Sequence, residues 1–160
     1  MNLPSALQGK RPPPNEAHAA GAVGLRAFAR IAELWHLSIA EQLTLLGLSS
    51  RSTFFKWRKE PQVRLPRDTL ERISYILGIY KALQLLLPDT RAADEWVRRP
   101  NEAAVFGGRS ALDRMLSGNV ADLYIVRQYL DAQRGSRQIT WSVSNPHPRS
   151  ARCAGNRVFV

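Results

Sequence analysis

Apolar residues recur at intervals of three or four positions along most of this chain, and this spacing places them on one face of a helix. Leu25, Phe28, Ile31, Ala32 and Trp35 form the first such run. Further runs follow as far as residue 130, separated by short stretches of polar residues, glycine and proline. The pattern predicts an all-α fold.

Two short helices joined by a tight turn are predicted next, at about residues 39–46 and 50–60. Ser38 can cap the first of them, and Glu41 three positions later completes a capping box. Gly47 suits the left-handed position that ends a helix. Ser49 or Ser50 can then cap the second helix. A generic helical hairpin shows the same caps and the same apolar faces.

The outer face of the second helix is cationic, and a generic hairpin does not need this feature. Phe54 and Trp57 can bury against the preceding helices, which leaves the polar side outward. The arrangement favours a helix-turn-helix motif whose second helix enters the major groove of DNA. The residues predicted to contact phosphates and base edges are Ser50, Arg51, Ser52, Thr53, Lys56, Arg58 and Lys59.

The charge distribution agrees with a polyanionic ligand. Of the net charge of +10, residues 51–72 carry +4 and residues 132–160 carry +5, whereas residues 73–131 are neutral. Clustered cations suit nucleic acid because each neutralised phosphate releases counterions. A solvated charged surface without a ligand would give the same counts.

A long helix is predicted from Asp68 or Thr69 to Leu87, ending at Pro88. It is apolar on two sides, so it is buried from two directions. Either it is the central helix of the fold, or it packs on a second copy and makes a homodimer. The two stripes are Leu70, Ile73, Leu77 and Tyr80, and Ile76, Ile79, Leu83 and Leu86.

The composition excludes several classes of protein. No run approaches the ~18 apolar residues of a membrane span, and the N-terminus lacks the apolar centre of a secretory signal. We therefore expect a cytoplasmic protein with no membrane partner. His18, His36 and His147 are scattered, and no cluster has the spacing of metal ligands. We expect no enzyme, no metal and no other cofactor.

The segment from Trp96 to Asn119 has a high density of loop and cap signals. A short helix capped by Asp89 or Thr90 precedes it, and Ser110 with Asp113 predicts the start of another helix. The last helix runs from about residue 120 to residue 133. Such a neutral segment suits recognition of a protein better than recognition of DNA.

This segment resembles the toxin-binding domain of the Xre/MbcA/ParS antitoxins, which pair with RES-domain toxins in type II toxin–antitoxin modules. The resemblance covers about residues 89–132, and the family carries an Xre-like helix-turn-helix upstream. It rests on Trp96, Arg99-Pro100-Asn101, Phe106-Gly107-Gly108-Arg109-Ser110, Leu112-Asp113, Leu116, Gly118 and the final helix at 126–130. It implies an antitoxin that covers the active site of an NAD-consuming RES toxin and binds its own promoter.

Side-chain chemistry suits this role. Glycine allows close backbone approach, arginine supplies several donors, and large aromatic or thioether side chains anchor interfaces. Core packing is favoured for Trp96 and Leu112, whereas recognition is favoured for Arg109 and the two glycines, for which phosphate binding is an alternative. The residues predicted to bind the toxin are Trp96, Arg99, Asn101, Phe106, Gly107, Gly108, Arg109 and Met115.

The sequence thus predicts four segments. They are a flexible leader at 1–22, a helix-turn-helix domain at 23–88, a toxin-binding domain at 89–133, and a basic tail at 134–160. The tail does not resemble the family; it is a disordered end, an extra polyanion-binding arm, or the product of an altered reading frame. The expected partners are a RES-domain toxin, operator DNA and a second copy, with nucleoid association when promoter-bound. The alternative function is a stand-alone repressor with a dimerising or ligand-sensing C-terminal half.

Overall fold

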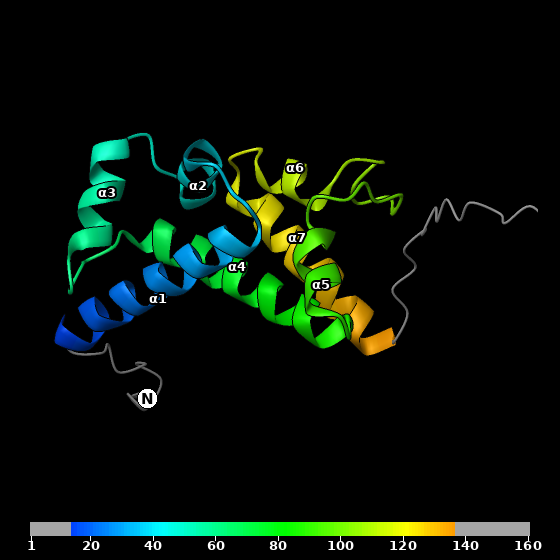
Figure 1. Ribbon diagram of the computed structural model, residues 1–160, viewed down its shortest axis with the longest axis horizontal. Coiled ribbons are helices and arrows are strands. Elements are labelled where there is room, and N and C mark those ends of the chain that lie inside the picture. Colours follow the sequence, from blue (N-terminus) through cyan, green and yellow to red (C-terminus); the bar gives the residue numbers. More distant parts are fainter. Residues whose placement is uncertain (1–13, 137–160) are drawn as a thin grey trace, which may run out of the picture.

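The computed structural model describes residues 14–136, which form seven helices and no strand (Figure 1). An antiparallel bridge joins Pro100 and Ser110. The all-α prediction is confirmed. The predicted basic tail from residue 137 onward and the first thirteen residues of the predicted leader lie outside the described part. The helices are α1 (Pro14–Leu34), α2 (Ile39–Leu46), α3 (Arg51–Lys59), α4 (Arg67–Leu86), α5 (Thr90–Trp96), α6 (Ala111–Met115) and α7 (Val120–Ser136).

The first helix starts earlier than the sequence pattern indicated. It begins at Pro14, within the segment predicted as a flexible leader (1–22). Proline is favoured at the first helical position, and residues 17–22 hold four alanines, the residue with the highest helix propensity. Ala22 is buried, and a Cβ at Gly21 would lie 2.7 Å from the carbonyl oxygen of Val63. The α3–α4 linker therefore packs directly on this part of α1.

The predicted caps of α2 and α3 are confirmed. The Ser38 amide donates to Glu41 Oε2 at 2.6 Å, and the Glu41 amide donates to Ser38 Oγ at 3.2 Å. Gly47 has φ 71°, the left-handed conformation expected of it. Of the two candidate serines, Ser50 caps α3, since its Oγ accepts from the Thr53 amide at 3.3 Å.

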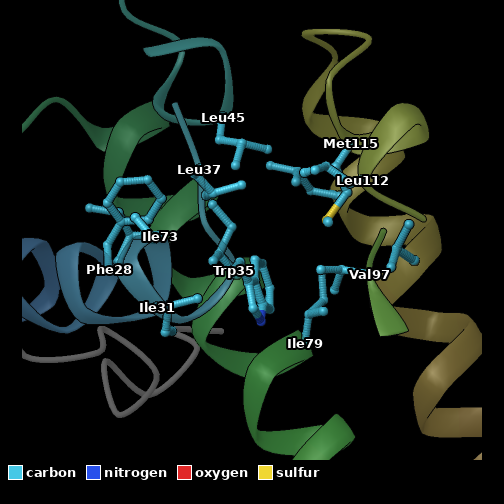
Figure 2. Close-up of a cluster of buried hydrophobic side chains, with 14 of the residues drawn as sticks. Phe28, Ile31, Trp35, Leu37, Leu45, Ile73, Ile79, Val97, Leu112 and Met115 are labelled. Atoms are coloured by element: carbon cyan, nitrogen blue, oxygen red, sulfur yellow. The ribbon is translucent and has the colours of Figure 1, made fainter. Parts of the chain in front are cut away.

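Helix α4 is central, which accounts for its two apolar stripes within one chain. It packs against α1, α2, α5 and α7, and Ile76, Ile79 and Leu83 are fully buried. One continuous core includes residues from all seven helices. In Figure 2, Trp35 and Ile79 lie between the side chains of α1 and those of Val97, Leu112 and Met115. The predicted boundary at residues 88–89 therefore does not divide the core.

Candidate nucleic-acid and partner interfaces

The outer face of α3 is cationic and open to solvent. Arg51, Ser52, Lys56 and Lys59 are all exposed, as the sequence predicted for a DNA-contacting helix. On the opposite side Phe54 is fully buried and holds the helix against the core. Trp57 is only half-buried, so it packs less deeply than the spacing suggested. The helix therefore presents one apolar side inward and one cationic side outward.

Four of the predicted DNA-binding residues, Ser50, Ser52, Thr53 and Arg58, also make contacts within α3 or its cap. The Oγ atoms of Ser50 and Ser52 are 2.9 Å apart, and Ser50 caps the helix through the Thr53 amide. Thr53 itself is half-buried. The Arg58 guanidinium lies 5.7 Å from the centre of the Phe54 ring, a cation–π distance that fixes its direction. Ser50 and Thr53 thus help to start the helix.

Phe55 is an exposed residue of α3 that the sequence reasoning missed. Its side chain is 41% exposed although it is large and apolar, and it lies in the same stripe as Arg51, Ser52 and Lys56. Consecutive helical residues point about 100° apart, so Phe54 and Phe55 cannot both face the core. This adjacency is the signal that could have identified Phe55. Its ring can contact thymine methyl groups.

The turn between α2 and α3 is held by the start of α4. Arg72 is buried, and its Nε donates to Asp68 Oδ2 at 2.7 Å. Thr69 Oγ1 donates to the Leu46 carbonyl at 3.3 Å. A Cβ at Gly47 would lie 2.8 Å from Arg72 Nε, so only glycine leaves room for this guanidinium. Arg72 belongs to the cationic block at 51–72 but serves the scaffold and not the outer surface.

The segment between α5 and α6 is a closed loop with an exposed tip. Its two ends are tied by backbone bonds from Asn101 to Arg109 at 3.1 Å and from Gly108 to Asn101 at 3.1 Å. Gly107 and Gly108 have φ 59° and 80°, and a Cβ at either would meet nothing within 4 Å. Both glycines are therefore required by backbone conformation and leave the tip accessible.

Three of the predicted toxin-binding residues lie beneath this loop and not on its surface. Trp96, Phe106 and Met115 are 4%, 3% and 1% exposed. The Trp96 and Phe106 ring centres are 5.8 Å apart, and Tyr129 of α7 lies 5.0 Å from Phe106. All three side chains belong to the core of this chain, and contact of these residues with a toxin stays a prediction.

The remaining predicted toxin-binding residues are accessible. Arg99 and Arg109 are exposed, and Asn101 is half-buried because its Oδ1 accepts from the Ala103 amide at 2.9 Å. Arg99 Nη2 is bound to Glu95 at 2.5 Å. Within residues 14–136 the Arg109 side chain has no hydrogen-bond acceptor, which leaves its guanidinium available to a partner. The accessible surface is thus polar and cationic.

The capping residues at the start of α6 include a carboxylate, Asp113, whose charged form is stabilised by its neighbours. The Ser110 hydroxyl and amide donate to Asp113 Oδ2 at 2.6 and 3.0 Å. These hydrogen bonds, together with the positive charge of Arg109, lower the pKa of Asp113 below its ordinary value despite partial burial. The capping box predicted from Ser110 and Asp113 is confirmed.

Arg98 joins the C-terminal module to the helix-turn-helix, and no local sequence pattern predicted this contact. Its Nε donates to the Trp35 carbonyl and its Nη2 to the His36 carbonyl, both at 2.8 Å. Its Nη2 also lies 3.4 Å from Glu41 Oε2. Burial alone would raise the pKa of Glu41, but hydrogen bonds from Ser38 and Arg98 lower it. Arg98 therefore holds the α1–α2 corner from the base of the loop.

No group of histidine, cysteine and carboxylate side chains within residues 14–136 could hold a metal ion. In the same range, no helix has the length and apolar character needed to cross a bilayer. The helix-turn-helix with its cationic second helix, joined to a helical module with an exposed glycine loop, is the architecture of a two-part regulatory protein.

Comparison with known proteins identifies the family. The chain belongs to the Xre/MbcA/ParS antitoxins: residues 15–78 match the antitoxin Xre-like helix-turn-helix domain, and residues 82–135 match the antitoxin Xre/MbcA/ParS C-terminal toxin-binding domain. It is also 58% identical over 111 residues to the uncharacterized protein y4oB of Sinorhizobium fredii (strain NBRC 101917 / NGR234), covering 69% of this chain and 84% of that protein. Both matched domains are regulatory and non-enzymatic, and they imply a toxin and DNA as partners.

Proposed function

We propose that this antitoxin neutralises a RES-domain toxin that consumes NAD⁺, by covering its active site, and that it binds its own operon promoter. The observation that supports both activities is the separation of their surfaces. Figure 1 places α3 and the loop between α5 and α6 at opposite ends of the molecule. A toxin on the loop and DNA on α3 can therefore be bound without direct competition.

On the DNA side, the proposal assigns base and phosphate contacts to the exposed face of α3. Arg51, Lys56 and Lys59 neutralise phosphates or read guanine edges, and Phe55 packs on thymine methyl groups. Two copies bind the operator together, because helix-turn-helix proteins gain affinity from two half-sites. The Ile76, Ile79 and Leu83 side of α4 is buried within one chain, whereas Leu70 on the other stripe is 37% exposed.

On the toxin side, the proposal assigns contact to Arg99, Asn101 and Arg109 with the backbone of Gly107 and Gly108. The Arg109 guanidinium can make paired hydrogen bonds to a carboxylate or to backbone carbonyls of the toxin. The left-handed glycines keep the tip free of side chains, so the toxin surface can approach the backbone closely.

The test is co-expression with the RES-type product of the neighbouring gene, scored by growth and cellular NAD⁺. Wild-type antitoxin is expected to restore both and to co-purify with the toxin. Arg109→Glu is expected to fail in rescue while DNA binding is retained. Lys81→Glu, an equal charge change at an exposed position of α4, serves as the control. If Arg109→Glu rescues growth at the wild-type dose, the loop is not part of the toxin interface. If no neighbouring gene encodes a toxin, and the wild type rescues no growth, a stand-alone repressor is favoured.

A further inference from the structure

A groove of about 420 Å³ runs between α1 and the last turn of α3, and its rim is cationic. Its floor includes Ala22 and Leu25 of α1, which are buried, and the half-buried ring of Trp57. The exposed cations along the rim are Arg26 and Arg30 from α1 and Arg58 and Lys59 from α3. Two carboxylates, Glu33 and Glu60, also line the groove, and Glu60 lies 3.9 Å from Lys56. The groove thus combines positive charge from two helices that are far apart in sequence.

Much of this charge is not neutralised by the protein. Arg30 pairs with Glu33 at 3.0 Å, and Arg58 lies on the ring of Phe54. Arg26 and Lys59 have no carboxylate within 4.0 Å among the described residues. Exposed, unpaired cations placed on both walls of one groove suit a ligand with regularly spaced negative charges, and a nucleic-acid backbone has this property.

The position of the groove relative to α3 identifies which part of DNA would reach it. Helix α3 has nine residues, so at 1.5 Å per residue its last turn lies about 10 Å from its first residues. In helix-turn-helix complexes the N-terminal residues of the second helix contact base edges. The last turn of α3 then lies over the flanking sugar–phosphate strand, next to Arg26.

We propose that this groove binds the phosphate backbone of operator DNA, with Arg26 as a contact supplied by α1. The proposal rests on DNA binding by α3 as proposed above, and it adds a non-specific contact outside the recognition helix. Such a contact raises affinity for any sequence and fixes the orientation of the protein, but it does not change the preference for the operator.

The test compares full-length wild type, Arg26→Ala, Arg26→Lys and Lys81→Ala by fluorescence anisotropy on operator and scrambled duplexes over a salt series. Arg26→Ala is expected to lower the slope of log affinity against log salt by about 0.9, the value for one phosphate contact, and to weaken both duplexes equally. Arg26→Lys is expected to restore the slope, and Lys81→Ala to leave it unchanged. Arg26 is exposed, so the variants are expected to unfold at the wild-type temperature.

The outcomes separate this proposal from the proposed function. If the wild type binds the operator and Arg26→Ala keeps the wild-type slope, the groove is not a phosphate site although α3 still binds DNA. A loss of toxin co-purification without a change in slope would assign the groove to a protein partner and overturn the proposal. Absence of any DNA binding by the wild type would overturn promoter binding and the groove together.

Discussion

Replacing Arg98 by alanine is expected to destabilise the whole helical core although the side chain is 39% exposed. The change removes two hydrogen bonds of 2.8 Å to the carbonyls of Trp35 and His36, at the C-terminus of α1. Hydrogen bonds to charged groups contribute about 1.5–3 kcal/mol each when buried. Water can replace the guanidinium at this partly exposed corner, so we discount the sum to about 2 kcal/mol.

The contact to Glu41 adds little to this figure. The atoms are 3.4 Å apart and both side chains are partly exposed, so the ion pair contributes about 0.5 kcal/mol or less. A cation also interacts favourably with the C-terminal end of a helix dipole, which reinforces the hydrogen bonds to the Trp35 and His36 carbonyls that follow α1. Lysine carries a single ammonium group instead of a planar guanidinium that can donate to both carbonyls, so Arg98→Lys is expected to retain only part of the stability.

The assay is urea denaturation of the free antitoxin followed by tryptophan fluorescence and circular dichroism, with thermal unfolding alongside. For a domain of this size, a loss of about 2 kcal/mol corresponds to a fall of roughly 6–10 °C in Tm. Arg91→Ala is the matched control, because Arg91 also pairs with a carboxylate but its side chain is 86% exposed. Equal midpoints for Arg98→Ala and wild type, or equal losses in both variants, would refute the assigned role of Arg98.

Three further outcomes are expected. Arg51→Ala with Lys56→Ala should lower the salt slope of promoter binding by about 2 and leave toxin co-purification intact; parallel loss of both would contradict separate surfaces. Gly47→Ala should reduce urea stability more than Gly107→Ala, because both have positive φ but only the first lacks room for a Cβ. Hydrogen bonds from Ser38 and Arg98 lower the pKa of Glu41 from its ordinary value of 4.5, so its contribution to stability should be present above that value and lost as the pH falls through the lowered pKa; Glu41→Gln should flatten the acid dependence of the urea midpoint.

Features that depend on a few neighbouring residues were predictable from the sequence. The capping boxes at Ser38 and Ser110 and the left-handed Gly47 each need only residues within a few positions, and all three are confirmed. The exposed cationic face of α3 is equally local, since it follows from helical spacing once Phe54 is assigned to the core. Local chemistry thus determined these three caps and the exposed cationic face of α3.

Features that depend on distant residues were not predictable. Trp96 and Phe106 belong to residue types that serve both as interface anchors and as core, and their contact with Tyr129, more than twenty positions away, could not be read from the local sequence. The early start of α1 rests on small alanines, which give a weak apolar signal. Arg98 contacts residues more than fifty positions earlier, and no local pattern encodes that separation.

The two proposed functions use separate parts of the surface, but the two family domains share one core. Helix α4 spans residues 67–86, so both family domains share it. At Gly78 the helix surface is open enough for the Arg127 guanidinium of α7 to lie across it, and α1 packs on the same helix. A chain cut within α4 would expose Ile76, Ile79 and Leu83, which are fully buried in the intact protein. Arg51 and Arg109 are exposed on separate parts of the surface, so we expect substitutions there to affect one partner only. Because the two halves share α4, we expect substitutions that destabilise this helix to affect both partners.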